Sequence, residues 1–259
     1  MKIVIKLGGT LLDSPGSRNR LAREIAVVRD SAVVVHGGGK QMTRYLAERG
    51  VESTFVNGLR VTTPEILDAV LKIFAGTVNQ ELVAALIAAG ASAVGLSGID
   101  GLIAEAEQMS PELGFVGRTI RSNGHLLDLL ASNGYLPVVA CVAADRKGQI
   151  YNVNADQLAV ACAASFGAER LVFLTDVEGV RGGNGETLHT LTAEQCQELI
   201  TSGVATGGMQ AKLNAAMDAL ERGIDEVIIA PGAQPALLNK LTAGEAVGTR
   251  LLRAEKVAS

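Results

Sequence analysis

The chain has 259 residues, a formal net charge of -4 at pH 7, no tryptophan and 3% aromatic residues. This length can bury a full core as one large domain or two modest ones, and the charge and scarce aromatics exclude the basic, base-stacking surface of a nucleic-acid-binding protein. No apolar run approaches the length of a membrane span, and the first is too short for a signal peptide. We therefore expect a cytoplasmic protein with no nucleic-acid or membrane partner.

The three cysteines, Cys141, Cys162 and Cys196, belong to no CxxC or Cys/His motif. Their odd number and spacing favour a reducing compartment and argue against a structural zinc site, so we expect no metal site among the side chains.

Short apolar runs alternate with amphipathic segments along the chain. Because these runs lack a polar alternation, they are typical of parallel strands that helices cover on both faces. We therefore predict an α/β fold, a three-layer αβα sandwich around a mainly parallel sheet. The predicted strands are residues 2–6, 32–36, 92–96, 136–142, 170–174 and 226–230.

Two helices have clear end signals. Thr63 is a cap residue in front of Pro64, which suits the first position of a helix, and a second amphipathic helix follows this one. Another helix, over residues 155–166, ends at a glycine. We place there the boundary between an N-terminal lobe, residues 1–166, and a C-terminal lobe, residues 167–259.

The first two predicted strands both run into glycine turns, IVIKLGG at 3–9 and VVVHGGG at 33–39. Consecutive glycines between a strand and a helix offer bare backbone N–H groups to an anion, and Lys6 adds a positive charge at the first turn. Neither turn matches a Walker A loop or the GxGxxG dinucleotide pattern. The alternative is that the glycines only permit tight turns.

The later part of the chain holds further polar candidates. Residues 176–189 should form a mobile loop at the carboxyl end of a strand, where ligands of open α/β sheets bind. Lys212 follows a glycine pair near the start of a helix, and Asp156 follows two asparagines at the start of another. Arg60 has the planar fork that suits a carboxylate. As single residues, each of these is also compatible with an ordinary surface charge.

Several ordered motifs carry a more specific signal than any one of them. They are KLGG at 6–9, HGGG at 36–39, NGLRVT at 57–62, GYLPVV at 134–139, YNVNAD at 151–156, LTDVEGV at 174–180 and GGMQAKLNAA at 207–216. In this order and spacing the chain resembles the amino acid kinase family and, within it, the acetylglutamate kinases. The resemblance implies a phosphotransferase of arginine biosynthesis that uses ATP to phosphorylate the side-chain carboxylate of N-acetyl-L-glutamate.

The resemblance also implies roles for single residues. At the matching positions Lys6 and Lys212 would stabilise the transferring phosphoryl group, and Asp156 would orient both lysines. The remaining implied positions are Gly8 and Gly9 for the phosphate, Gly38, Gly39, Arg60 and Asn152 for the acyl amino acid, and Thr175, Asp176, Val177, Glu178, Gly179, Val180, Arg181, Val204, Ala205 and Thr206 for the nucleotide.

The implied reaction is chemically coherent with these residue types. A carboxylate nucleophile is ionised at neutral pH, so the reaction needs no general base. It needs cations on the phosphoryl transition state, and Mg²⁺ would be held mainly by ATP oxygens.

Other functions remain open on the sequence alone. The substrate could instead be an aminoadipate derivative or N-succinylglutamate, because one methylene changes binding by only about 1 to 3 kcal/mol. A catalytically silent sensor of nucleotide or amino acid is a different class, as is a nicotinamide oxidoreductase. Arginine-inhibited relatives carry an additional N-terminal helix, whereas the first strand here begins at residue 2, so we expect a homodimer that is insensitive to arginine.

Overall fold

The structure is a computed structural model that describes residues 1–253. Its central sheet is built from the strands β1 (Ile3–Leu7), β2 (Ala32–His36), β5 (Ala93–Ser97), β8 (Leu136–Ala140), β11 (Arg170–Thr175), β14 (Thr190–Leu191), β15 (Glu226–Pro231) and β16 (Thr249–Leu252). Their order across the sheet is β14-β16-β15-β11-β1-β2-β8-β5. The strands from β15 to β5 are parallel to their neighbours, and β16 runs antiparallel to β15.

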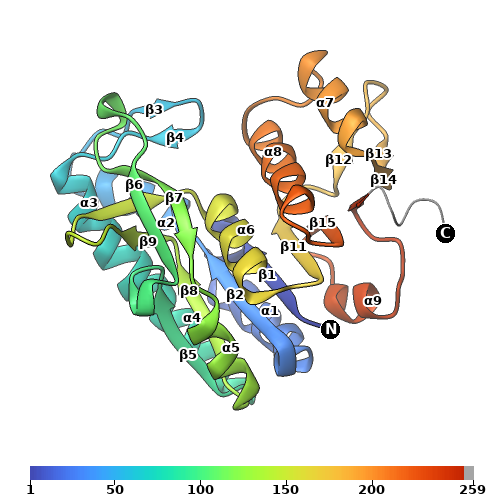
Figure 1. Cartoon of the computed structure of the whole chain (residues 1–259), viewed down its shortest axis with the longest axis horizontal. Helices are drawn as coiled ribbons and strands as arrows, with labels where there is room; N and C mark the ends of the chain where they lie inside the picture. The colour runs from blue at the N-terminus through green and yellow to red at the C-terminus, as the bar shows by residue number, and fades with distance from the viewer. Residues whose placement is uncertain (254–259) are drawn as a thin grey trace.

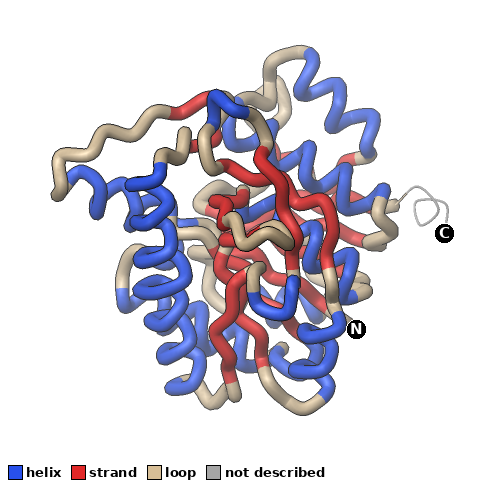
Figure 2. Tube along the Cα trace, turned by 60° about the vertical axis from the view of Figure 1, so that its left-hand side comes forward, coloured by secondary structure: helices blue, strands red, loops and turns tan. Residues whose placement is uncertain are grey.

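Helices cover both faces of this sheet (Figures 1 and 2). They are α1 (Pro15–Val27), α2 (Gly39–Ala47), α3 (Pro64–Val70), α4 (Asn79–Ala88), α5 (His125–Ser132), α6 (Ala155–Phe166), α7 (Ala193–Thr201), α8 (Gly207–Glu221) and α9 (Leu237–Thr242). Helices α1, α4 and α9 form one layer, and α5, α6 and α8 form the other. The predicted αβα sandwich is confirmed.

All six predicted strands are present, and one ends earlier than predicted. The apolar run at 136–142 was predicted as one strand, but β8 ends at Ala140 and Val142–Ala144 forms a separate strand, β9. The chain leaves the central sheet at Cys141, whose N–H donates to the His36 carbonyl, and then joins a second sheet. Apolar composition does not mark such a change of sheet.

That second sheet is a small closed barrel of β9 with β6 (Ala104–Gln108), β7 (Val116–Ser122) and β10 (Ile150–Val153), in the order β10-β7-β6-β9. No continuous apolar run predicts this barrel, because β6 and β7 read AEAEQ and VGRTIRS and carry charged or polar residues at many positions. The barrel brings Val116 of β7 and Asn152 and Val153 of β10 to the lining of the cavity described below.

The helix predicted after Thr63 is longer than expected. The Thr63 side chain accepts a hydrogen bond from the Ile66 N–H, as its cap position predicts. The two helices that the sequence predicts here are one continuous helix, because a π-helical segment, Leu71–Val78, joins α3 to α4. The combined helix Pro64–Ala88 is long and apolar enough to cross a membrane, but half of its most apolar window is buried in the fold, as in a core helix.

The chain also forms two short hairpins outside the central sheet. One is β3 (Phe55–Val56) with β4 (Leu59–Arg60), and the other is β12 (Val180–Arg181) with β13 (Thr187–Leu188). The second hairpin occupies the segment 176–189 that was predicted as a loop, and it does begin at the carboxyl end of β11.

Candidate active site

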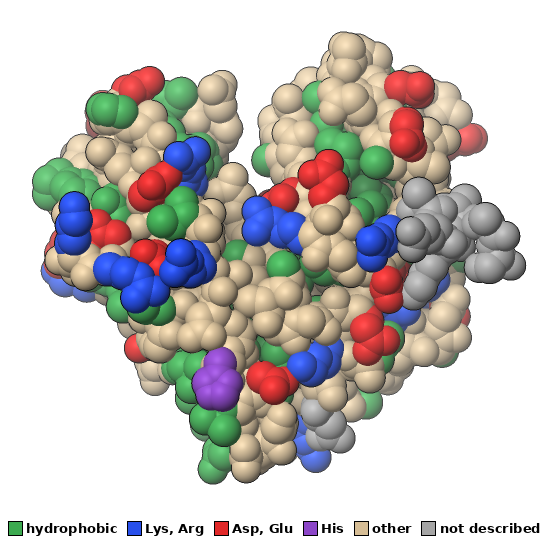
Figure 3. Space-filling view, in the orientation of Figure 1, with side chains coloured by type: hydrophobic (Ala, Val, Ile, Leu, Met, Phe, Trp, Pro, Cys, Tyr) green, Lys and Arg blue, Asp and Glu red, His purple; other side chains and the backbone are tan. Residues whose placement is uncertain are grey.

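A cavity of about 550 Å³ opens above the carboxyl ends of the central strands. In the space-filling view it lies in the cleft between the barrel side of the molecule and the α7 and α8 side (Figure 3). Its lining comes from both predicted lobes, with Lys6, Gly38, Arg60 and Asp156 from residues 1–166 and Lys212 from residues 167–259.

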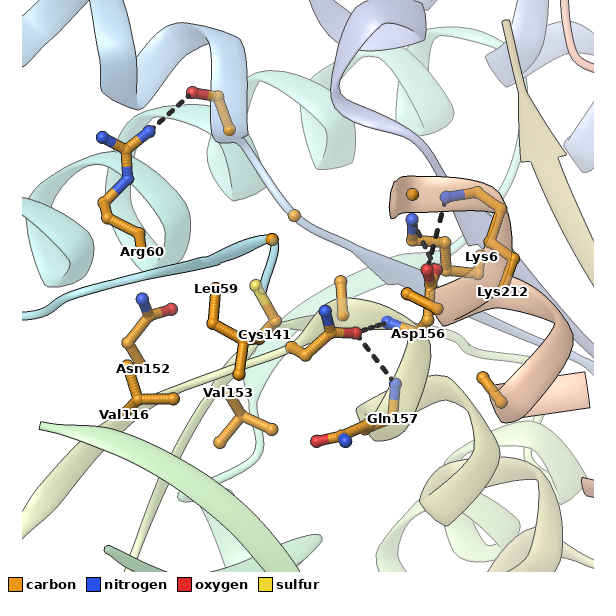
Figure 4. A pocket seen from close by; sticks show the side chains of 18 of the residues that line it. Lys6, Leu59, Arg60, Val116, Cys141, Asn152, Val153, Asp156, Gln157 and Lys212 are labelled. Atoms are coloured by element: carbon orange, nitrogen blue, oxygen red, sulfur yellow. Dashed lines mark hydrogen bonds and ion pairs between the residues drawn. The ribbon is translucent and has the colours of Figure 1, made fainter. Parts of the chain in front are cut away.

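Three charged side chains meet at one end of this cavity (Figure 4). Lys6 Nζ lies 2.7 Å from Asp156 Oδ1, and Lys212 Nζ lies 3.4 Å from Asp156 Oδ2. The lysines come from β1 and α8, and the carboxylate comes from the first turn of α6. Residues that are far apart in the sequence therefore form one cluster.

Local structure fixes the carboxylate between the two ammonium groups. The Asn154 side chain caps α6 by accepting hydrogen bonds from the N–H groups of Asp156 and Gln157. Burial alone would raise the pKa of the Asp156 carboxyl, but the charges of Lys6 and Lys212 and their hydrogen bonds outweigh burial and hold this pKa below its ordinary value. The cluster carries one negative and two positive charges, and its net positive charge suits an anionic ligand.

Arg60 and Asn152 lie on the opposite side of the cavity from this cluster (Figure 4). The buried Arg60 guanidinium donates to Thr43 Oγ1 at 2.8 Å and to Ser53 Oγ, and it lies 4.6 Å from the centre of the Phe55 ring. Asn152 Nδ2 donates to Thr62 Oγ1 at 3.0 Å. Burial lowers the pKa of Arg60, but a guanidinium stays charged at neutral pH.

The two glycine turns are placed differently. Gly37, Gly38 and Gly39 line the cavity, and the first N–H groups of α2, which have no acceptor within the helix, begin there. In the other turn, the Gly8 N–H donates to the Leu174 carbonyl at 3.0 Å, and Gly9 begins a short 3-10 turn, Gly9–Leu12. The Gly8 amide thus already has a partner in the chain.

The residues predicted for the nucleotide lie beside the cavity and do not line it within the described chain. Thr175 ends β11 and is buried, Asp176, Val177 and Glu178 are exposed, and Gly179 and Val180 are buried, whereas Arg181 in β12 is exposed. The second segment, Val204 to Thr206, leads into α8. A Cβ at Gly183, two residues beyond the first segment, would lie 3.9 Å from the Val204 side chain, so the hairpin that contains Val180 and Arg181 contacts the second segment.

The cavity also has an apolar wall that the sequence analysis did not assign. Leu59, Val116 and Val153 line it on the side of Arg60 and Asn152 (Figure 4), and the Phe55 ring lies against the Arg60 guanidinium. Leu59 lies inside the NGLRVT motif, which was the signal available for it, whereas Val116 belongs to the barrel that was not predicted. This wall suits a small apolar group next to a carboxylate.

No group of three or more His, Cys, Asp or Glu side chains among residues 1–253 is arranged to hold a metal ion. The side chains of this part of the chain therefore provide no cage for a divalent cation of their own.

Comparison with known proteins agrees with this arrangement. A model of the amino acid kinase family matches residues 1–231. The chain is similar to the acetylglutamate kinase of Solibacter usitatus, with 62% identity over 98% of this chain and 100% of that protein. It is also similar to the acetylglutamate kinase of Acidobacterium capsulatum, with 45% identity over 89% of this chain and 91% of that one.

Solved structures show the same fold. The smu.665 protein of Streptococcus mutans superposes with a TM-score of 0.83 at 27% identity, and the alignment covers 97% of this chain and 98% of that one. With the family model matching nearly the whole chain, this protein belongs to the amino acid kinase family.

Proposed function

We propose that this chain transfers the terminal phosphoryl group of ATP to the side-chain carboxylate of N-acetyl-L-glutamate, a step of arginine biosynthesis, in the cytoplasm. The observation that carries this proposal is the pairing, within one cavity, of the Lys6–Asp156–Lys212 cluster with Arg60 and Asn152 on the opposite side. Similarity to acetylglutamate kinases over nearly the full chain supports the choice of substrate.

The reaction joins two anions and moves no proton. A carboxylate oxygen of the substrate forms a bond to the γ-phosphorus while the bond from that phosphorus to the bridging oxygen breaks, and the products are an acyl phosphate and ADP. The barrier comes from the repulsion of negative charges, so cations held in fixed positions supply most of the catalysis. Lys6 and Lys212 lie close enough together to contact one phosphoryl group from two sides.

Asp156 would orient the two lysines rather than accept a proton. Its lowered pKa keeps the carboxylate ionised, so it holds both ammonium groups in place before ATP binds. When ATP binds, Lys6 and Lys212 can each replace the contact with Asp156 by a contact with a phosphate oxygen, which is also negatively charged.

At the other side of the cavity, Arg60 and Asn152 would bind the substrate's carboxylate and main-chain groups, together with the turn at Gly38 and Gly39. A guanidinium that Thr43 and Ser53 already hold loses little side-chain freedom on binding. The apolar wall at Phe55, Leu59 and Val116 would receive the acetyl methyl group.

The nucleotide would bind over residues 175–181 and 204–206, with its phosphates reaching Lys212 and the turn at Gly8 and Gly9. Because the Gly8 N–H already donates to the Leu174 carbonyl, the role of Gly8 there would be to leave room for the phosphates rather than to donate to them. Residues 1–166 would thus act as the acyl amino acid lobe and residues 167–259 as the ATP lobe. Mg²⁺ would enter with ATP and be held by its phosphate oxygens, which agrees with a cavity in which Asp156 is already paired.

A kinase assay tests the proposal with N-acetylglutamate, N-succinylglutamate and N-acetylaminoadipate as parallel substrates, following ADP release and trapping the acyl phosphate with hydroxylamine. We expect N-acetylglutamate to give the highest kcat/KM. A preference for either of the other two would correct the substrate, and folded protein without ADP release on any of them would refute the kinase activity.

We further propose that the chain forms a homodimer. Support comes from β5, which lies at the end of the sheet with half-buried side chains, and from Ile87 on the neighbouring α4, whose side chain is 55% exposed. Light scattering should give twice the 26.8 kDa chain mass. A monomer or a hexamer would contradict this proposal.

A further inference from the structure

A buried polar pair lies directly behind the second glycine turn, and the proposed reaction does not use it. His36 ends β2 and is 0% exposed, while Asn79 begins α4 and is 1% exposed. The Asn79 side-chain nitrogen, Nδ2, lies 3.0 Å from His36 Nε2. Polar groups buried this deeply are retained only when they are hydrogen-bonded.

The surroundings of Asn79 determine which way its amide points. Nδ2 lies 2.9 Å from the Val138 carbonyl oxygen, which can only accept a hydrogen bond. This contact identifies the nitrogen end of the amide, so the same NH₂ group donates to His36 Nε2. Nε2 must then be the unprotonated nitrogen of the ring.

The proton of the neutral ring therefore resides on Nδ1. Burial lowers the pKa of His36 to about 4, so at neutral pH the imidazole has one N–H group. Nδ1 lies 2.9 Å from the carbonyl oxygen of Gly37, and with the proton there it donates to this oxygen. Gly37 is the first glycine of the turn that lines the cavity.

The π-helical segment Leu71–Val78 brings side chains of the helix Pro64–Ala88 against the glycine turn at residues 37–39. A π-helix adds a residue to each turn and so shifts which side chains face a given neighbour. From this segment Phe74 packs against Gly38, since a Cβ at Gly38 would lie 2.7 Å from the Phe74 ring. Asn79 follows it immediately, and Gly95 on β5 leaves the space that its amide fills. One helix thus contacts the turn through a ring and through a hydrogen-bond chain.

We propose that Asn79 is a positioning residue, which fixes His36 in its Nδ1–H tautomer so that His36 holds the Gly37 carbonyl and keeps the Gly38–Gly39 turn in the shape that receives the acyl amino acid. The last step rests on the proposed function, in which Gly38 and Gly39 bind this substrate. The chain from Val138 to Asn79, His36 and Gly37 then links the central sheet to the substrate.

The tautomer can be measured on the free protein, without substrate. Long-range ¹H–¹⁵N NMR of the His36 ring at pH 7.5 should show Nδ1 protonated and Nε2 unprotonated. In Asn79→Asp the carboxylate can only accept, so Nε2 should become protonated. A wild-type ring with its proton on Nε2 would overturn the inference even if the protein is an active kinase. So would a ring that still has its proton on Nδ1 in Asn79→Asp when the ¹³C shift of the introduced carboxyl shows that it is ionised.

Steady-state kinetics test the consequence for binding. In Asn79→Asp and in the near-isosteric Asn79→Leu, the KM for the acyl amino acid should rise about tenfold or more, the size of one lost hydrogen bond, while the KM for ATP stays within about twofold. Equal rises in both KM values, or no rise in either variant, would overturn the positioning role.

Leu86→Ala is the matched control. Leu86 is fully buried in the same helix, so its truncation should lower the free energy of unfolding without altering the Asn79–His36 hydrogen bond. It should leave both KM values unchanged at a temperature where all variants are folded. If the wild-type protein proves inactive on every acyl amino acid, the proposed function fails, while the NMR result still decides the tautomer.

Discussion

At the scale of single residues, the site depends on one carboxylate that is shared by two lysines. Asp156 is buried, and an isolated buried carboxylate would lower the stability of the fold. Lys6 and Lys212 therefore stabilise the charge of Asp156, and Asp156 in turn orients the two lysines. The same contacts hold two cations near each other without substrate. Removal of one lysine therefore changes both the charge available to the phosphoryl group and the position of the other lysine.

Lys212→Ala should lower kcat by roughly two to three orders of magnitude, as the loss of other transition-state donors does. Steady-state assays with folded protein check this. Lys72→Ala is the control, since Lys72 is exposed and pairs only with Asp68 on its own helix. An unchanged kcat in Lys212→Ala would remove this lysine from the mechanism.

Arg60→Ala should raise the KM for the acyl amino acid strongly and change the KM for ATP little, because it removes uniform binding of one substrate. Arg118→Ala, at an exposed surface pair with Glu107, should change neither constant. Similar rises in both KM values of Arg60→Ala would contradict the assignment of Arg60 to the carboxylate side of the cavity.

His36 should make the stability of the protein depend on pH. Its pKa falls from 6.5 to about 4 on folding, so between these values the unfolded chain binds the extra proton. The free energy of unfolding is therefore highest above pH 6.5 and should decrease by about 3 kcal/mol as the pH falls to 4.

Denaturant titrations at several pH values measure this effect. His36→Gln should lose that decrease, whereas His125→Gln, at an exposed position, should keep it. Asp156 loses its stabilisation only below its ordinary pKa of 3.8, because its pKa is lowered from there, so its effect lies outside this window. An identical slope in His36→Gln and wild type would contradict the buried neutral ring.

At the scale of elements, a helix and a glycine turn shape the substrate side of the cavity together. Gly38 has a φ of -170°, which any residue can adopt, so its lack of a side chain is needed for the close approach of Phe74 and, less tightly, of Val78. The π-helical segment presents Phe74 there. The shape of the turn therefore depends on a helix that contributes little polar chemistry of its own.

Gly38→Ala should raise the KM for the acyl amino acid, because the new methyl group would overlap the Phe74 ring and displace the turn. The double variant Gly38→Ala/Phe74→Leu should recover part of this loss. Gly16→Ala, with open space around it at the start of α1, should be neutral. Without recovery in the double variant, the contact with Phe74 is not the cause.

How far the sequence predicts such elements depends on how local their signals are. The six strands of the parallel sheet follow from continuous apolar runs, and the capped helix start at Thr63 follows from the residue types alone. In the barrel, β6 alternates alanine with glutamate, two weak strand formers, and β7 has no regular alternation. Both strands depend on pairing with distant partners, so their local patterns indicate a strand only weakly. The apolar residues of the π-helical segment have the spacing of an ordinary α-helix, so the sequence does not distinguish the two.

The site follows the same rule. Lys6, Asp156, Arg60 and Asn152 lie in motifs and were predicted, and the fold brings them to one cavity. Phe74 lies in an apolar stretch of helix that indicates packing, and its contact with Gly38 depends on the exact turn of that helix. The hydrogen bond between Asn79 and His36 joins a helix to the central sheet, and the spacing of hydrophobic residues does not predict it.

At the scale of the whole molecule, one sheet runs through both predicted lobes. β1 pairs with β2 on one side and with β11 on the other, from Ile3 opposite Arg170 to Leu7 opposite Leu174. Because backbone hydrogen bonds and a common core cross the boundary after residue 166, the lobes should not unfold separately.

Calorimetry of the protein without ligands should therefore show a single cooperative transition, with equal calorimetric and van't Hoff enthalpies for the folding unit. A fragment of residues 1–166 should not fold alone, since one edge of β1 would be unpaired at the centre of the sheet. Two separate transitions, or a stable fragment, would show that the lobes are independent.

The central position of β1 also determines when the sheet can form during synthesis of the chain. The ribosome produces Ile3–Leu7 early, but the second partner of this strand, Arg170–Thr175, emerges only after most of the chain. Until then the apolar segment IVIKL has an open edge that other chains can pair with. Nascent chains that stall before residue 170 should accordingly depend on chaperones, and the finished enzyme should not.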